Sequence, residues 1–195
     1  INKLYNSIHF ISEILRKDSP DSFFKKYTNS VLEHLSFSLV ERKYSTVDEY
    51  ISIRLMTGGM YAVIDLIEYA DSNYLTQKMI TDPKISLKEL CDQCALIGVL
   101  SNDLFSYAKE KHSDYNLINA YLITKEASNY LDAVSKSIDR INTIHANFQR
   151  TIHNSRKNLI FFNLSERLII ETYLNSLETI VSCSYHWQKS TNRYI

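Results

Sequence analysis

The chain has 195 residues, of which 45% are hydrophobic, and its 22 basic and 22 acidic side chains give a formal net charge of zero. This length suffices for one hydrophobic core but not comfortably for two domains. A neutral chain has no general electrostatic attraction to nucleic acid or anionic membranes, so functions driven by overall basic charge are excluded.

Residues that interrupt helices are scarce, since only 3 glycines and 2 prolines occur in the whole chain. Long segments without such breakers predict an all-helical protein, and we expect residues 1–195 to form a single domain. No run of about 18 uncharged apolar residues is present, so the sequence predicts no membrane-spanning helix. The first residue is not Met, and we expect the chain to start partway into a longer one.

The three cysteines are Cys91, Cys94 and Cys183. An odd number of cysteines without a secretory signal is typical of reduced thiols, which predicts a cytoplasmic protein. The Cys91-x-x-Cys94 spacing would also suit a redox or zinc site, but no second pair exists. Because free cysteine behaves as a small hydrophobe, a buried structural role is favoured for both.

Apolar residues recur at helical spacing in the first third of the chain. One stripe covers residues 1–17 and a second covers about 23–44, which predicts two helices. Pro20 and its neighbours mark the loop between them and the start of the second helix. Thr46, with Glu49 three residues later, resembles a capping box and predicts the start of a third helix.

Two adjacent glycines, Gly58 and Gly59, interrupt the apolar pattern of this third helix. Each glycine costs about 1 kcal/mol relative to alanine inside a helix. The pair therefore predicts a break that frees backbone carbonyls and amides, with a plain turn between two helices as the alternative. The helical pattern then continues over about 61–80 and stops at Asp82-Pro83.

Ser86, with Glu89 three residues later, predicts a second capping box and the start of the central helix. Gly98 lies within this helix, one turn before Asn102. A glycine at this position either leaves space beside the helix or permits close helix packing, and the sequence leaves both alternatives open.

The central helix carries a polar series, Asn102, Ser106 and Glu110, at intervals of four residues. In a helix these three side chains fall within roughly 80° of one face and span roughly 12 Å of its axis. Because helix side chains lean toward the N-terminus, the long Glu110 side chain can reach back toward the other two. An amide oxygen, a hydroxyl and a carboxylate are hard donors that suit Mg²⁺. A solvated polar stripe is the alternative.

The last third predicts two long helices, over about 124–154 and about 165–190. The chain then closes with Arg193-Tyr194-Ile195, six residues after Trp187. From the residues alone, Trp187 could equally belong to an ordinary core.

The stretch from Asn102 to Glu110 reads Asn-Asp-x-x-Ser-x-x-x-Glu with Lys109 before the last residue, and it resembles the second metal-binding motif of class I terpene synthases. In that family the Asn, Ser and Glu hold one of three Mg²⁺ ions against a prenyl diphosphate, and the Lys contacts the diphosphate. The resemblance therefore implies that Asn102, Ser106 and Glu110 are metal ligands and that Lys109 binds diphosphate.

The same resemblance implies roles on the interrupted helix. Microbial terpene synthases carry an Arg there that senses the diphosphate, followed by a linker residue and by an effector residue at the helix break. These positions correspond to Arg54, Thr57 and Gly58. A guanidinium suits a diphosphate because its planar fork pairs with two oxygens at once.

The C-terminal Trp-x-x-x-Thr-x-Arg-Tyr resembles the closing signature of the same family. It implies that Arg193 and Tyr194 bind diphosphate when the site closes and that Trp187 lines the cavity. We expect Gly98 to border the same cavity. Aromatic faces such as that of Trp187 can stabilise a carbocation by up to about 2 kcal/mol when desolvated.

The resemblance implies an all-α antiparallel bundle of the class I terpenoid synthase type. It implies an enzyme, a lyase that ionises an allylic prenyl diphosphate with three Mg²⁺ ions and cyclises or quenches the carbocation to a terpene. Farnesyl diphosphate is the favoured substrate, with geranyl and geranylgeranyl diphosphate as alternatives. Substrate length, product skeleton and stereochemistry depend on cavity shape and stay open, as does homodimerisation.

One departure from the family is that no aspartate-rich Asp-Asp-x-x-Asp motif occurs in the sequence. We therefore expect the chain to be the C-terminal portion of a catalytic domain that lacks its N-terminal helices, and to be inactive alone. The alternatives are a non-catalytic helical bundle that binds a partner or an isoprenoid, and a chain-elongating prenyl diphosphate synthase, which normally carries two aspartate-rich motifs.

Overall fold

The structure is a computed structural model that describes residues 2–194, with the side chains of residues 2–5, 7, 8 and 194 left aside. The described part is helical throughout and contains no strand, which confirms the all-α prediction. Its elements are α1 (Asn2–Asp18), α2 (Asp21–Ser38), α3 (Val47–Thr57), α4 (Met60–Ala70), α5 (Gln77–Thr81), α6 (Leu87–Glu110), α7 (Leu117–Ile123), α8 (Tyr130–Asn158), η1 (Leu159–Phe161), α9 (Leu164–Ser190) and η2 (Asn192–Tyr194).

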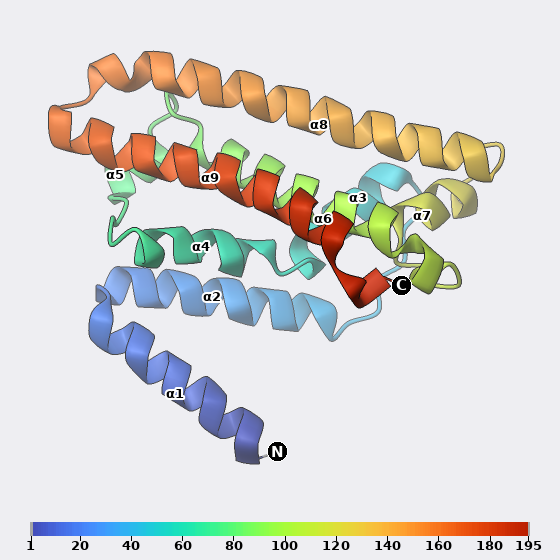
Figure 1. Cartoon of the computed structure of the whole chain (residues 1–195), viewed down its shortest axis with the longest axis horizontal. Helices are drawn as coiled ribbons and strands as arrows, with labels where there is room; N and C mark the ends of the chain where they lie inside the picture. Colours follow the sequence, from blue (N-terminus) through green and yellow to red (C-terminus); the bar gives the residue numbers. More distant parts are fainter. Residues whose placement is uncertain (1, 195) are drawn as a thin grey trace.

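Helix α6 lies at the centre of the bundle and packs against α3, α4, α8 and α9. Figure 1 shows α8 and α9 running antiparallel on one side of it, and α2 and α4 running antiparallel on the other. Both hydrophobic clusters of the core contain α6 side chains, Leu90 and Cys94 in one and Val99 and Leu100 in the other. The central position of α6 follows from its sequence, because apolar residues before Asn102 occupy much of its circumference.

The predicted break between α3 and α4 is confirmed. Helix α3 ends at Thr57, Gly59 adopts a left-handed conformation with φ of 72°, and the two helices are bent by 43°. Gly59 is favoured there because residues with a Cβ are strained at positive φ.

Several predicted helix boundaries need correction. Helix α2 ends at Ser38 rather than near residue 44, since the exposed Leu39 and Val40 gain no burial from a longer helix. The capping box at Ser86 is wrong, because Ser86 is left-handed and its hydroxyl donates to the carbonyl of Pro83. The capping of α3 by Thr46 is confirmed.

Helix α7 was not predicted, and α8 starts at Tyr130 rather than near residue 124. Within the described residues, no single helix is long and apolar enough to cross a membrane. Only the bent pair α3–α4, taken together, has the length and composition for it.

Candidate functional site

The polar series on α6 comes together as the spacing predicts. Ser106 is fully buried, and its hydroxyl donates a 2.6 Å hydrogen bond to Oε2 of Glu110. Asn102 lies one turn earlier on the same helix and is partly buried. A hydroxyl and a carboxylate thus meet on one face of α6, with an amide one turn away.

These residues fit a hard cation in the chemistry of their donor atoms, which are all oxygens. Among the described residues, no group of three or more His, Cys, Asp and Glu side chains is placed to hold a metal ion, here or elsewhere. Glu110 carries the only charge among the three predicted ligands. A divalent ion at this position therefore needs further negative charge, which a bound anion would supply.

Arg54 on α3 reaches across to α6 and pairs with Asp103, the residue that follows Asn102. Its Nε and Nη2 atoms lie 3.0 and 2.9 Å from Oδ1 of Asp103. The carboxylate is fully buried, whereas the Arg54 side chain is 18% exposed. The sequence-predicted diphosphate sensor is therefore placed beside the polar series on α6, and an internal carboxylate binds one edge of its guanidinium.

Asp103 joins three elements. Its Oδ2 atom accepts hydrogen bonds from the Tyr50 hydroxyl on α3, at 2.5 Å, and from the Leu117 amide at the start of α7, at 3.1 Å. Burial raises the pKa of the Asp103 carboxyl, while Arg54 and these donors oppose that rise. Burial alone would lower the pKa of Arg54, but Asp103 and, less strongly, Tyr50 and Glu110 hold it above its usual value.

Asn116 contacts the site, although sequence reasoning assigned it no role there beyond the resemblance of Asn116-Leu117-Ile118 to an Asn-Leu-Val-like step that terpene synthases commonly carry. It is fully buried, and its side-chain amide donates to the Asp103 carbonyl at 2.7 Å and to Oε2 of Glu110 at 3.4 Å. Its own carbonyl oxygen caps α7 by accepting from the amide of Ile118. An N-cap former before the apolar Leu117 is a further sequence signal. The contact with Glu110 could not be predicted, because it depends on the loop between the helices.

The predicted linker and effector lie at the end of α3. Thr57 donates its hydroxyl hydrogen bond to the Ile53 carbonyl, and its linker role stays a prediction. Gly58 packs against α6 so closely that an added Cβ would lie 2.1 Å from Cγ1 of Val99. A glycine is therefore required at this position for α3 to approach α6, independently of any effector role.

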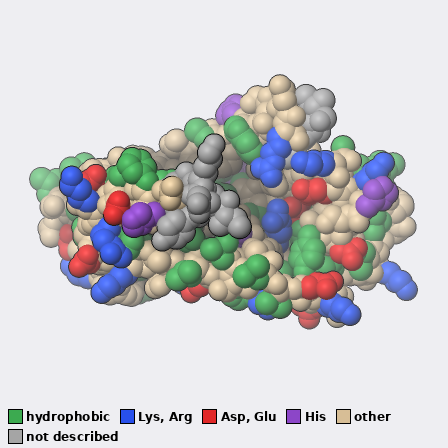
Figure 2. Space-filling model, turned by 90° about the horizontal axis from the view of Figure 1, so that it is seen from below, with side chains coloured by type: hydrophobic (Ala, Val, Ile, Leu, Met, Phe, Trp, Pro, Cys, Tyr) green, Lys and Arg blue, Asp and Glu red, His purple; other side chains and the backbone are tan. Residues whose placement is uncertain are grey.

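The C-terminal segment returns to the same helix, since η2 packs against α6. Arg193 in η2 and Lys109 on α6 are both exposed, and the side chain of Tyr194 lies outside the described part. On the face seen in Figure 2, a hollow lies beside a group of basic and acidic side chains. The fold thus brings the segments of Arg54, Glu110 and Arg193 to one helix, although the contacts of Arg193 with a ligand stay a prediction.

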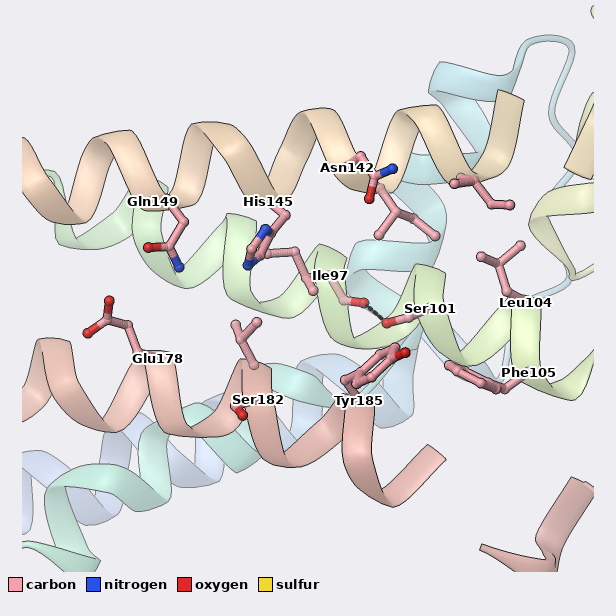
Figure 3. A pocket seen from close by; sticks show the side chains of 13 residues that line it. Ile97, Ser101, Leu104, Phe105, Asn142, His145, Gln149, Glu178, Ser182 and Tyr185 are labelled. Atoms are coloured by element: carbon pink, nitrogen blue, oxygen red, sulfur yellow. Dashed lines mark hydrogen bonds between the residues drawn. The ribbon is translucent and has the colours of Figure 1, made fainter. Parts of the chain in front are cut away.

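A cavity of about 730 Å³ lies between α6, α8 and α9. In Figure 3, His145 and Gln149 point from α8 toward Glu178 and Ser182 on α9, and Tyr185 lies close to Ser101. The lining residues are Ile97, Ser101, Leu104, Phe105, Ile138, Ile141, Asn142, His145, Gln149, Glu178, Val181, Ser182 and Tyr185. Ser106 and Glu110 are not among them, so this cavity and the oxygen cluster occupy different faces of α6.

Trp187 and Gly98 are not among the lining residues of this cavity, and their place beside a bound substrate stays a prediction. Trp187 is half exposed. Gly98 faces Met60, whose Cε atom would lie 2.9 Å from an added Cβ, and its carbonyl accepts a hydrogen bond from Gln188. Of the two alternatives for Gly98, close helix packing is the one observed.

Comparison with known families gives a match to terpene synthase family 2, C-terminal metal binding, over residues 4–148. Among curated proteins, terpene synthase 1 of Physarum polycephalum is 27% identical over 152 residues, which cover 76% of this chain and 42% of that protein. The (+)-T-muurolol synthase of Roseiflexus castenholzii, named as cyclising (2E,6E)-farnesyl diphosphate, is 25% identical over 189 residues, covering 90% and 54% of the two chains. The chain thus spans about half the length of these relatives.

Solved structures share the fold. A variant of cucumene synthase superposes with a TM-score of 0.79 at 17% identity, over 91% of this chain and 60% of that one. Germacradien-4-ol synthase from Streptomyces citricolor gives a TM-score of 0.71 at 17% identity, over 89% and 57% of the two chains. The predicted class I terpenoid synthase architecture is thereby confirmed.

Proposed function

The chain belongs to terpene synthase family 2, and from this premise we propose that it serves the magnesium-dependent ionisation of a prenyl diphosphate and the formation of a terpene. Two contacts support the proposal. Ser106 forms a hydrogen bond with Glu110 on α6, and Arg54 forms an ion pair with Asp103 on the same helix. An oxygen-rich cation site beside a partly exposed guanidinium suits a ligand that carries both phosphate charge and bound metal.

The proposed substrate is farnesyl diphosphate, with geranyl and geranylgeranyl diphosphate as alternatives. The name of the Roseiflexus relative, which specifies farnesyl diphosphate, supports this choice. We propose Asn102, Ser106 and Glu110 as the ligands of one of three Mg²⁺ ions. Arg54, Lys109, Arg193 and Tyr194 are the proposed diphosphate-binding residues.

In this proposal, Glu110 and Ser106 would hold Mg²⁺, and the bound ion would stabilise the negative charge that develops on the departing diphosphate. Arg54 would donate hydrogen bonds to diphosphate oxygens. Breaking the allylic carbon–oxygen bond leaves its electron pair on the diphosphate and a carbocation on the hydrocarbon. Apolar side chains then exclude water while the carbocation cyclises or passes a proton to the released diphosphate.

We propose that residues 1–195 form the C-terminal portion of the catalytic domain. Two observations support this: the chain spans about half the length of its relatives, and its sequence contains no aspartate-rich motif. The free thiols Cys91, Cys94 and Cys183 are consistent with a cytoplasmic location, which we also propose.

Calorimetric titration of the chain with inorganic pyrophosphate, with and without Mg²⁺, tests the proposed site. We expect Mg²⁺ to raise the affinity for pyrophosphate about 10- to 100-fold, the range typical of coupled ligands. Glu110→Gln should abolish this coupling. Glu89→Gln is the matched control, because Glu89 lies on the same helix and accepts a hydrogen bond from Gln93, away from the site. The proposal is contradicted if the affinity for pyrophosphate is the same with and without Mg²⁺, or if Glu110→Gln leaves the effect of Mg²⁺ on that affinity unchanged.

Incubation with Mg²⁺ and C10, C15 and C20 prenyl diphosphates, followed by product analysis, tests the role of the chain in catalysis. We expect binding without terpene formation, since the aspartate-rich motif is absent from the sequence. Terpene release by the chain alone would contradict its assignment as part of a catalytic domain. A longer product diphosphate would instead favour a chain-elongating synthase, and no diphosphate binding would favour a non-catalytic bundle.

A further inference from the structure

The buried carboxylate of Asp103 has partners on both α3 and α7. Its two oxygens accept bonds from Arg54, from the Tyr50 hydroxyl and from the Leu117 amide. A charge buried in this way persists only when hydrogen bonds and an opposite charge compensate it. All of these partners converge on the residue next to Asn102.

The contact fixes one edge of the Arg54 guanidinium and leaves the other available. A guanidinium has five N–H groups. Nε of Arg54 donates to Oδ1 of Asp103, and Nη2 lies 2.9 Å from the same oxygen. Among the residues whose side chains are described, none forms a hydrogen bond with Nη1, and the Arg54 side chain retains 18% exposure. The charge of Glu110 acts on the same guanidinium. Arg54 is therefore held side-on, with donors left over for an anion near Glu110.

Asn116 connects Asp103 to Glu110. Its amide bridges the Asp103 carbonyl and the Glu110 carboxylate, at 2.7 and 3.4 Å. Because its carbonyl oxygen also caps α7, the amide group cannot rotate without losing the cap at Ile118. Asn116 thus links Glu110, which Ser106 also binds at 2.6 Å, to the segment of α6 that holds Arg54.

We propose that Asp103 and Asn116 are positioning residues of the diphosphate site: Asp103 orients Arg54 toward the diphosphate, and Asn116 orients Glu110 toward the metal ion. This inference rests on the proposed function. Neither residue touches the ligand itself. Each acts through the residue that it holds, as partners behind a ligand-binding side chain do in other metal sites.

A double-mutant cycle with Arg54→Ala and Asp103→Asn, measured by titration with pyrophosphate and Mg²⁺, tests the Asp103 half. We expect Asp103→Asn to weaken binding about 10- to 100-fold, the usual effect of removing such a partner. In the Arg54→Ala background, Asp103→Asn should cause no further loss, because the residue through which it acts is gone. A merely structural role would weaken binding in both backgrounds.

Tyr50→Phe is the control for lost stability in this cycle. It removes a hydrogen bond to Oδ2 of Asp103 but leaves the pairing of Arg54 with Oδ1 in place. We expect a lower melting temperature with an affinity within about threefold of the wild type, less than the loss expected for Asp103→Asn. Thermal unfolding of every variant fixes the folded fraction during titration.

Asn116→Ser tests the second half and does not depend on the folding of the Asp103 variant. Serine keeps an N-cap for α7 but removes the amide that reaches Glu110. The matched control is Asn129→Ser, since Asn129 caps α8 by accepting from the Asp132 amide and is exposed. We expect a roughly tenfold loss of Mg²⁺-dependent affinity for Asn116→Ser and none for the control.

The outcomes separate the two proposals. If the wild type does not bind pyrophosphate with Mg²⁺, the proposed function fails and the positioning roles fail with it. If the wild type binds but both Asp103→Asn and Asn116→Ser bind equally well, only the positioning roles are overturned. Losses that simply add in the double-mutant cycle also overturn the role of Asp103 while the proposed function stands.

Discussion

At the scale of single residues, the ion pair between Arg54 and Asp103 shows how a ligand-binding group can be kept inside a protein. Removing one partner of a buried pair typically costs about 3–5 kcal/mol, because the other charge is left uncompensated. Asp103 therefore stabilises the junction of α3 and α6 as well as orienting Arg54. The same contact serves stability and the proposed binding function.

The cysteines give a prediction at this scale. Burial raises the pKa of the Cys91 thiol to about 11 and that of Cys94 to about 12, while Cys183 is exposed. Because the thiolate is the reactive form, a thiol with a pKa about three units above pH 8 is ionised in roughly one molecule in a thousand. We expect a thiol reagent at pH 8 to modify Cys183 rapidly and the other two only after denaturation. Rapid modification of Cys91 or Cys94 in the folded protein would contradict their structural role.

Contacts between site residues could be predicted from the sequence where both residues lie on the same helix. Ser106 and Glu110 could be paired from their spacing, because a helix places residues four apart on the same face. The partner of Arg54 could not, since Asp103 lies 49 residues away and meets it only after α3 packs on α6.

At the scale of helices, the glycine break at Gly58 controls how closely α3 approaches α6. An alanine there would place its Cβ 2.1 Å from Val99, a contact that requires the helices to move apart. The break itself was predictable, since two glycines are costly inside a helix. The start of α6 after Ser86 was predicted as well, but the capping box was not formed, because the left-handed Ser86 donates its hydroxyl hydrogen bond to Pro83.

Gly58→Ala should destabilise the fold by about 2 kcal/mol, the typical cost of overpacking a core contact. In a Val99→Ala background the same substitution should cost less than about 1 kcal/mol, because the clashing methyl group is gone. Gly98→Ala is the control, since it meets only the flexible end of Met60 and should be nearly neutral. Denaturant unfolding measures all of these variants. An equal cost of Gly58→Ala in both backgrounds would refute the steric explanation.

At the scale of the whole molecule, α6 links the elements that carry the candidate site. Helix α6 packs against α3, which carries Arg54, and against α7, which Asn116 caps. It also packs against η2, which contains Arg193. The central helix could be identified from composition, whereas its neighbours were fixed only by packing. Three segments distant in sequence therefore reach one helix, as a shared headgroup site requires.

The central claim is that this helix and its neighbours bind a diphosphate through magnesium. A crystal structure of the chain with Mg²⁺ and pyrophosphate tests it most directly. The account predicts a metal ion about 2.0–2.1 Å from the oxygens of Asn102, Ser106 and Glu110, with Nη1 of Arg54 on a phosphate oxygen. A pyrophosphate bound elsewhere, or an Arg54 turned away from it while the ligand occupies the site, would contradict the account.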